Sequence, residues 1–434
     1  MDYTVGIKSH SDRTAEPASG ASSLREIRVF GPPGCGKTTK TKELVIHSCQ
    51  EFGSDAVTVC AFTRTAAREL VSRNLPVDPR RIGTVHALVF RELGHPKLIA
   101  DKASLEQWNQ ANPGYLMRGG VNSVSALDDP YLDFDAQGDG EGDGLLQEAN
   151  RLRGLMIPVE AWQDSVREFY GAWTAYKELN SLLDFTDLIE QAIKIDLPPP
   201  DGTRALFVDE TQDLSPLELT LIRQWGAHCD VLYIAGDDDQ CLYRFKGSTP
   251  NAFLFPPLPP EQIIVLDQSY RVPRAVHAVA CKISQQIKTR QEKAYKPRPY
   301  DGHVRYMDDV TYQYPISLKD RLLAWIKAGK TAAILGTCSY MLDPIKKELR
   351  EWGIPFHNPY RRIRGDWNPL QGREGSMSAA KRLLAFLKVS RNKGWWTYAD
   401  LWAWAAELDA KSIFAHGGKT EIRRMAEREE MATL

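Results

Sequence analysis

One segment near the N-terminus contains the residue types that bind a nucleotide phosphate. Residues 31–38 read Gly-Pro-Pro-Gly-Cys-Gly-Lys-Thr and fit the pattern G-x-x-x-x-G-K-[ST]. In this pattern backbone N–H groups face the phosphate oxygens, Lys37 adds a positive charge near the β- and γ-phosphates, and Thr38 offers a hydroxyl to Mg²⁺. A chance glycine turn is the alternative, but a strand at 27–30 and a helix at 38–49 provide the required flanks. We therefore predict binding of ATP and Mg²⁺ by Gly31, Pro32, Pro33, Gly34, Cys35, Gly36, Lys37, Thr38 and Thr39.

Two adjacent carboxylates follow an apolar run later in the chain. Asp209 and Glu210 come directly after residues 205–208, which read as a buried strand. We predict that Asp209 holds Mg²⁺ through water and that Glu210 orients and deprotonates the attacking water. Alone, the pair could be an ordinary acidic strand end. Together with a phosphate loop it predicts nucleotide hydrolysis.

A third polar loop follows the next apolar run. Residues 237–240 read Asp-Asp-Asp-Gln, and Gln240 is expected beside the same strand ends. Tyr243 and Phe245 then alternate with two basic residues, which is typical of surfaces that stack bases and contact a phosphate backbone. A strand with two different faces would show the same alternation, so this pattern is not specific by itself.

The elements that must position these residues alternate between strand and helix. This alternation predicts an α/β P-loop fold, with a parallel sheet, crossover helices and functional loops at the carboxyl ends of the strands. The expected strands are 27–30, 56–62, 205–208 and 231–235, and the expected helices are 38–49, 65–73 and 217–225.

A long insertion, about 91–180, separates the two series of strands. Its acidic, glycine-rich stretch 128–144 faintly resembles a calcium loop, but Asn150 stands where a bidentate glutamate is expected. We therefore interpret 128–144 as a solvated flexible loop. Residues 160–179 predict an amphipathic helix whose aromatic side chains belong to a core: Trp162, Phe169 and Trp173.

Composition sets broader limits. With 434 residues the chain is long enough for two to four domains, and 55 basic against 56 acidic residues argue against a basic coat over the whole surface. Seven cysteines without a C-x-x-C pair fit a reducing compartment. No apolar stretch is long enough for a membrane span, and 1–23 reads as a mobile tail rather than a secretory signal. We expect the protein in the cytoplasm, at the nucleoid, or in the cytoplasm of a viral host.

The order of the motifs resembles that of the UvrD/Rep-type superfamily 1 DNA helicases, up to about residue 385. Besides the two opening segments, matching elements occur in the family's order at 61–70, 83–88, 183–188, 236–245 and 266–271. The resemblance implies two RecA-like motor domains that clamp ATP and move along single-stranded DNA in the 3′-to-5′ direction, in DNA repair or replication.

The resemblance also implies roles for single residues. Gln240 would contact the γ-phosphate, Arg271 would be an arginine finger on it, and Tyr270 would stack on adenine. The residues that would line the single-strand path are Phe62, Thr63, His86, Tyr243 and Phe245. For His86 a structural histidine is an equally good interpretation.

The implied organisation has a first motor domain at 24–90 and 181–258, interrupted by an inserted helical subdomain at 91–180. Proline-rich 256–260 would be the hinge to a second motor domain, 259–385, with a helix at 273–288 and a strand at 332–336. Residues 386–434 would begin a second inserted subdomain.

The sequence departs from the family's pattern in three places. The acidic, glycine-rich stretch 128–144 enlarges or decorates the first insertion. No adenine-reading glutamine precedes Gly31, and the family's later motifs have no counterpart after residue 385. We therefore expect an incomplete second motor domain, with a protein partner as a possible source of the missing motifs. The alternative is a truncated or split helicase part that binds DNA in a nucleotide-dependent way without unwinding it. A P-loop kinase or GTPase would not explain the Asp-Asp-Asp-Gln run.

Overall fold

The computed structural model describes residues 25–61, 75–99, 102–118, 140–358, 367–368, 396–406, 414–428 and 431–432. The chain divides into two compact units, residues 1–304 and 305–434. The predicted helix at 65–73 lies outside the described residues.

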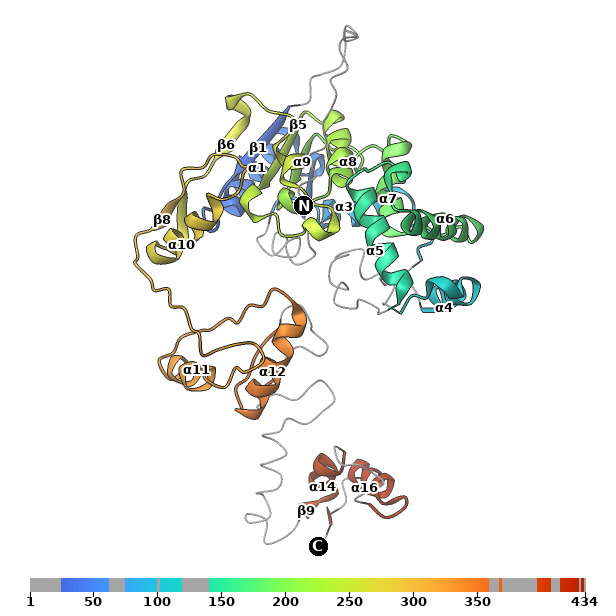
Figure 1. Ribbon diagram of the computed structural model, residues 1–434, viewed down its shortest axis with the longest axis vertical. Coiled ribbons are helices and arrows are strands. Elements are labelled where there is room, and N and C mark those ends of the chain that lie inside the picture. The colour runs from blue at the N-terminus through green and yellow to red at the C-terminus, as the bar shows by residue number, and fades with distance from the viewer. Residues whose placement is uncertain are drawn as a thin grey trace. The chain divides into compact units, whose positions relative to one another are not determined.

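A six-stranded parallel sheet organises the first unit (Figure 1). Its order is β3-β2-β4-β5-β1-β6, and each neighbouring pair is parallel. The predicted α/β fold with a parallel sheet is therefore confirmed. The strands are β1 (Glu26–Phe30), β2 (Val57–Ala61), β3 (Ile82–Thr84), β4 (Ala205–Val208), β5 (Val231–Gly236) and β6 (Ile263–Val265).

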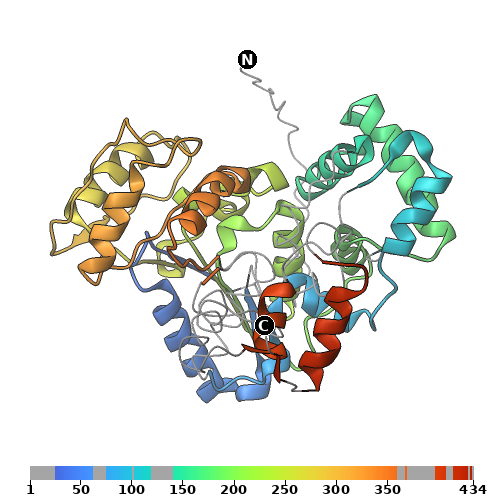
Figure 2. The ribbon, with the colours of Figure 1, turned by 90° about the horizontal axis from the view of Figure 1, so that it is seen from below.

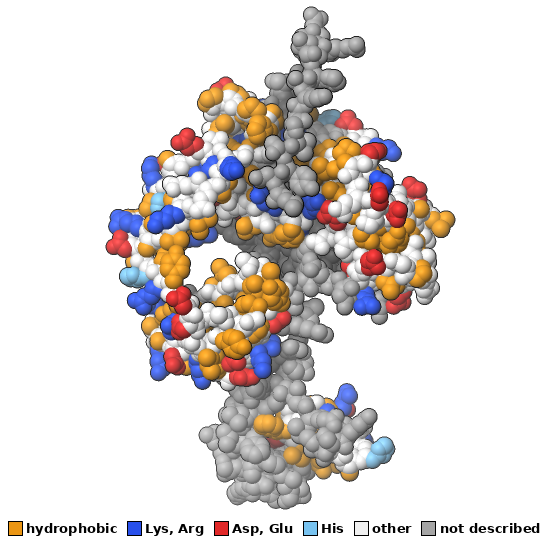
Figure 3. All heavy atoms as spheres, in the orientation of Figure 1, with side chains coloured by type: hydrophobic (Ala, Val, Ile, Leu, Met, Phe, Trp, Pro, Cys, Tyr) orange, Lys and Arg blue, Asp and Glu red, His pale blue; other side chains and the backbone are white. Residues whose placement is uncertain are grey.

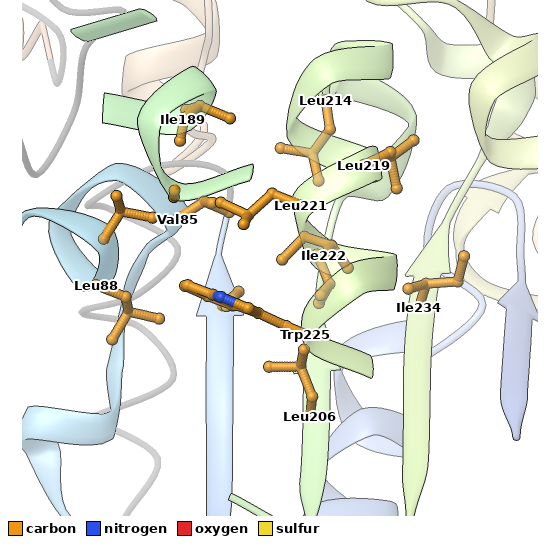
Figure 4. Close-up of a cluster of buried hydrophobic side chains, with 14 of the residues drawn as sticks. Val85, Leu88, Ile189, Leu206, Leu214, Leu219, Leu221, Ile222, Trp225 and Ile234 are labelled. Carbon is orange, nitrogen blue, oxygen red and sulfur yellow. The ribbon is translucent and has the colours of Figure 1, made fainter. Parts of the chain in front are cut away.

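Helices pack on both faces of the sheet and so bury its inner strands. Val57, Phe207 and Ala205 pack with Val45 of α1 in one apolar cluster. Figure 4 shows the other cluster, in which Trp225 of α8 is fully buried between the sheet and α3 and α7. α1 (Lys37–Phe52) contributes to the first cluster, and α3 (Val85–Glu92), α7 (Phe185–Lys194), α8 (Pro216–Ala227) and α9 (Pro250–Leu254) contribute to the second.

Three further helices form a group beside the sheet, as Figures 1 and 2 both show. They are α4 (Lys102–Ala111), α5 (Glu141–Gly154) and α6 (Asp164–Leu179). In the core of this helical group the rings of Trp108 and Trp173 pack edge to face, with their centres 4.9 Å apart. The predicted aromatic stripe is buried, with Trp162, Phe169 and Trp173 each at most 5% exposed.

Part of the predicted flexible loop is helical. Residues 141–144 form the first turn of α5, because the carboxylate of Asp143 accepts hydrogen bonds from the N–H groups of Arg118 (2.9 Å) and Gly140 (3.1 Å). An acidic side chain at this position also interacts favourably with the positive end of the helix dipole. Residues 119–139 lie outside the described residues.

The remaining elements are short. The first unit ends with β7 (Gln268–Pro273), α10 (Arg274–Ser284) and β8 (Lys296–Arg298). The second unit contains α11 (Leu318–Lys327), α12 (Leu342–Glu351), β9 (Trp396–Thr397), α14 (Tyr398–Ala405), α16 (Gly418–Glu427) and β10 (Met431–Ala432).

The predicted strand at 332–336 is wrong. This run is not paired with any strand among the described residues, and Leu335 is 91% exposed. Apolar β-formers adopt a strand only when a neighbouring strand satisfies their backbone groups.

The surface carries charges of both signs. Basic and acidic side chains of the first unit are interspersed on the face that Figure 3 shows. None of the described helices combines the length and apolar character required to cross a bilayer.

Candidate active site

Three loops of functional interest leave adjacent strands of the sheet. The register places Phe30 of β1 beside Gly236 of β5, and Val208 of β4 beside Ile234 of β5. Because these strands are parallel, the phosphate loop, the Asp209 loop and the Asp237 loop emerge at the same edge. The arrangement agrees with the neighbourhood expected from the sequence.

The phosphate loop connects β1 directly to α1. Gly34 and Gly36 have φ angles of +76° and +85°, in the left-handed region that favours glycine. The N–H of Gly31 donates to the Gly236 carbonyl (3.2 Å), which joins the loop to the end of β5. The Lys37 ammonium donates to the Gly31 carbonyl (2.8 Å), so the lysine folds back over the loop.

The first turn of α1 continues the loop. Thr38 and Thr39 follow Lys37 in this turn, whose N–H groups and dipole favour an anion. Cys35 is buried, its N–H donates to the Pro32 carbonyl (3.3 Å), and burial raises the pKa of its thiol. Cys35 thus supports the turn rather than offering a reactive thiolate.

The Asp209–Glu210 pair sits where β4 ends. Asp209 is 5% exposed, and its N–H donates to the Cys60 carbonyl of β2 (3.0 Å). Glu210 adopts a left-handed backbone with φ +53°. Such a conformation is rare for a residue with a side chain and is often found at functional sites.

Gln212 links this loop to the next one, and our sequence reasoning missed it. Its side-chain amide donates to a carboxylate oxygen of Glu210 (2.8 Å), while its carbonyl accepts from the N–H of Asp237 (3.0 Å). Gln212 is almost fully buried, so these bonds fix the direction of the Glu210 carboxylate. Its place two residues after Glu210 was the only signal available.

Gln240 lies in the loop after β5. Its amide donates to Asp237 Oδ2 (2.5 Å), and the other oxygen of the same carboxylate accepts from the N–H of Asp239 (3.3 Å). Asp237 is 1% exposed. The orientation of Gln240 therefore depends on a buried carboxylate.

A segment from beyond the sheet rests on the phosphate loop. The Ser269 hydroxyl donates to the Pro33 carbonyl, and the N–H of Tyr270 donates to the Gly34 carbonyl, both at 2.9 Å. Tyr270 is 72% exposed, and Arg271 is also exposed. The structure thus brings both predicted nucleotide-binding residues of this segment next to the phosphate loop. Ser269, which anchors the segment, was not identified from the sequence.

The predicted base-stacking residues occupy a turn and not a strand. Residues 244–246 form a single 3₁₀ turn, which excludes the alternating strand as an explanation of the pattern. The Tyr243 and Phe245 rings lie 6.0 Å apart, and the Lys246 ammonium lies 5.2 Å and 5.7 Å from their centres. An aromatic pair beside a cation suits a base and its phosphate.

His86 belongs to the first turn of α3 and faces Glu218 of α8. It is 8% exposed, and its Nδ1 is 3.7 Å from a Glu218 carboxylate oxygen. Burial lowers the pKa of His86, and Glu218 offsets this only in part. These surroundings favour the structural interpretation of His86. Phe62 and Thr63 lie outside the described residues.

Comparison with known proteins gives a consistent result. A family model described as an AAA domain matches residues 16–246, which is more than half of the chain. The ATP-dependent DNA helicase srs2 of Schizosaccharomyces pombe is 22% identical over 419 residues, 86% of this chain and 45% of the relative. The ATP-dependent DNA helicase UvrD1 of Mycobacterium leprae is 25% identical over 415 residues, 85% of this chain and 51% of the relative.

A shorter match is the ATP-dependent DNA helicase PcrA of Leuconostoc citreum, which is 26% identical over 267 residues, 56% of this chain and 35% of the relative. The chain thus spans about half of the length of these curated relatives or less. The family resemblance inferred from the motifs is confirmed. The chain belongs to the family of proteins with this AAA domain and is a distant relative of the superfamily 1 DNA helicases.

Proposed function

We propose that this protein is an ATP-driven translocase on single-stranded DNA that unwinds duplexes in the 3′-to-5′ direction. The observation that carries the proposal is the meeting of four segments at one sheet edge: the phosphate loop, Asp209–Glu210, the Gln240 loop and Ser269–Arg271. Each would supply one part of a phosphoryl-transfer site. The relatives' names, which all read ATP-dependent DNA helicase, support the same reading.

The hydrolysis step assigns one task to each side chain. Lys37 and Arg271 would neutralise charge that develops on the γ-phosphate, and Gln240 would contact the same group. Glu210, held in place by Gln212, would orient the attacking water and take its proton.

The donors around the loop fit a nucleotide-bound Mg²⁺. Thr38 and Asp209 offer a hydroxyl and a carboxylate, the hard oxygen ligands that Mg²⁺ prefers, and phosphate and water would complete the shell. The described residues contain no group of three or more acidic, histidine or cysteine side chains able to hold a metal. This donor set suits an ion that arrives with the nucleotide. When bound, Mg²⁺ neutralises the phosphate oxygens.

The single-strand path would pass over the turn at 243–246. Phe245 is 47% exposed and can offer a face to a base, with Lys246 beside it for the phosphate. Replacing a stacking aromatic by alanine costs about 1–3 kcal/mol per base. We therefore expect Phe245→Ala to weaken binding of single-stranded DNA about tenfold. Leu242→Ala is the matched control, because Leu242 directly precedes this turn, is 73% exposed and has no stacking face.

The test of the proposal is ATP hydrolysis by the full chain with and without single-stranded DNA, followed by strand displacement. We expect DNA to stimulate hydrolysis, and a duplex with a 3′ tail to be unwound faster than one with a 5′ tail. Hydrolysis that is stimulated by DNA without unwinding would support the alternative, a nucleotide-dependent DNA-binding protein. Absence of ATP hydrolysis would contradict the proposed translocase.

A further inference from the structure

The two ends of the segment that carries Arg271 pair with each other. β7 and β8 pair in parallel, with Gln268 beside Lys296 and Pro273 beside Arg298. The Gln268 side chain also donates to the Pro297 carbonyl (3.0 Å). Figure 1 shows β8 and α10 next to each other at this end of the first unit. Residues 268–298 therefore move most easily as one body.

This body contacts the phosphate loop at one place. Ser269 and Tyr270 bond the Pro33 and Gly34 carbonyls, and the Tyr295 hydroxyl, from the far end of the segment, lies 3.5 Å from the Pro33 carbonyl. Contacts from both ends of the segment converge on the same turn of the loop. A shift of the segment is thus expected to move the phosphate loop or to break these contacts.

The same body contacts the aspartate run at a second place, through two cations. The Lys293 ammonium is 2.9 Å from an Asp237 oxygen and 3.2 Å from an Asp239 oxygen, and it also bonds Asp238. Arg290 donates to both carboxylate oxygens of Asp239, from Nε (2.8 Å) and from Nη2 (2.6 Å). The five residues form a charge cluster, in which Lys293, Asp237 and Asp238 are buried and Arg290 at its rim is partly exposed.

The charge cluster holds Lys293 in its charged form. Burial alone lowers the pKa of Lys293, but the attraction of Asp237 and Asp238 outweighs it, so the pKa is raised. Three carboxylates could not share this space without a cation, because uncompensated buried charge is strongly unfavourable. The position of the aspartate run therefore depends on the 290–293 segment.

The charge cluster reaches Gln240 through a single carboxylate. Asp237 Oδ1 accepts from Lys293 (2.9 Å), and Asp237 Oδ2 accepts from the Gln240 amide (2.5 Å). Turning this carboxylate would break one bond or the other. Lys293 thus acts on Gln240 through Asp237, and Arg290 acts through Asp239 of the same loop.

We propose that Arg290 and Lys293 are positioning residues for Gln240, and that they couple its orientation to the segment that places Arg271 on the phosphate loop. The inference rests on the proposed function, since Gln240 must act in hydrolysis for its orientation to matter. Movement of the 268–298 segment would then shift the arginine finger and the glutamine together. Such coupling ensures that hydrolysis proceeds only when both are in place.

The test is a double-mutant cycle on ATP turnover by the full chain. Arg290→Gln is the main variant because Arg290 keeps about a quarter of its surface exposed and its loss leaves Lys293 in place. Misplacing a catalytic group by about 1 Å can cost 10²-fold, so we expect kcat to fall about 10- to 100-fold. The KM for ATP should stay within about threefold, because binding of the nucleotide is retained. Arg290→Lys should restore part of the loss.

The discriminating step is the combination with Gln240→Ala. If Arg290 acts through Gln240, the double variant should be no slower than Gln240→Ala alone, within about twofold. Lys288→Gln, an exposed lysine two positions before Arg290, is the control and should behave as wild type. Lys293→Met should show the same pattern wherever its thermal unfolding shows a folded protein.

Two results would overturn the inference in distinguishable ways. Independent, multiplicative losses in the double variant would show that Arg290 does not act through Gln240, while the proposed function would stand. A wild-type chain without ATPase activity, or a fully active Gln240→Ala variant, would refute the proposed function of the site and the inference with it.

Discussion

Replacing Gly34 by alanine tests whether the arginine-bearing segment rests on the phosphate loop. A Cβ atom at Gly34 would lie 2.4 Å from the Arg271 Cβ and 3.0 Å from the Ser269 hydroxyl oxygen. Gly36 offers a matched control two positions away. Its φ is also positive, but among the described residues the nearest atom to a Cβ there is the Thr39 Cβ, at 4.0 Å.

The two variants differ in a calculable way. Both force alanine into the left-handed region, which costs about 1 kcal/mol. Only at Gly34 must the neighbouring segment also move, because carbon atoms pack at about 3.5–4.0 Å and the available distance is 2.4 Å. Overpacking of this kind adds about 1–3 kcal/mol. We therefore expect the free energy of unfolding to fall by roughly 2–4 kcal/mol in Gly34→Ala and by about 1 kcal/mol in Gly36→Ala.

Urea unfolding followed by circular dichroism measures this difference. The comparison is meaningful where wild type and both variants share one slope against urea concentration. Equal losses for the two variants would contradict the predicted clash at Gly34, since the backbone strain would then be the whole effect. In that case residues 269–271 would not lie against Gly34.

Two further predictions concern buried carboxylates in the first unit. Burial raises the pKa of Asp213 from 3.8 to about 7, so the folded state favours the protonated form of this carboxyl group. The protonated carboxyl group therefore stabilises the fold near pH 4, and this stabilisation is lost as the pH rises to 7. Asp213→Asn stays neutral, and its melting temperature relative to wild type should increase between pH 5 and 7 and level off above; a constant difference would contradict the assignment. Arg153 is 4% exposed and bonds Asp184, so Arg153→Met should cost about 3–5 kcal/mol in thermal unfolding. Arg151→Met, which removes an exposed pair, should cost no more than about 1 kcal/mol, and similar losses for both variants would exclude a special role for the buried pair.

The core of the site could be predicted because it depends on local patterns. An apolar β-run that ends in glycines or carboxylates indicates a strand and the loop that follows it. The parallel arrangement then brings such loops to one edge, as found for Gly31, Asp209 and Asp237. The apolar faces of the helices likewise predicted the burial of Phe169 and Trp173.

The remaining features depend on contacts between distant residues. Lys293 lies in a charged run that resembles a solvated surface, and the Asp237 that neutralises it is 56 positions earlier in the chain. His86 was ambiguous because its burial arises from packing against Phe185 and Glu218 of other helices. The run at 332–336 has the composition of a strand, but β-propensity is expressed only beside a partner strand.

The most direct test of the account compares ATP binding with ATP hydrolysis in Glu210→Gln, with Lys37→Ala measured in parallel. Removing a general base slows the chemical step by about 10²–10⁴-fold. We predict that Glu210→Gln binds a fluorescent ATP analogue as tightly as wild type and hydrolyses ATP at least about 100-fold more slowly in the presence of single-stranded DNA. Lys37→Ala should lose DNA-stimulated hydrolysis altogether. Hydrolysis retained by Lys37→Ala, or loss of ATP binding by Glu210→Gln, would contradict the site as described.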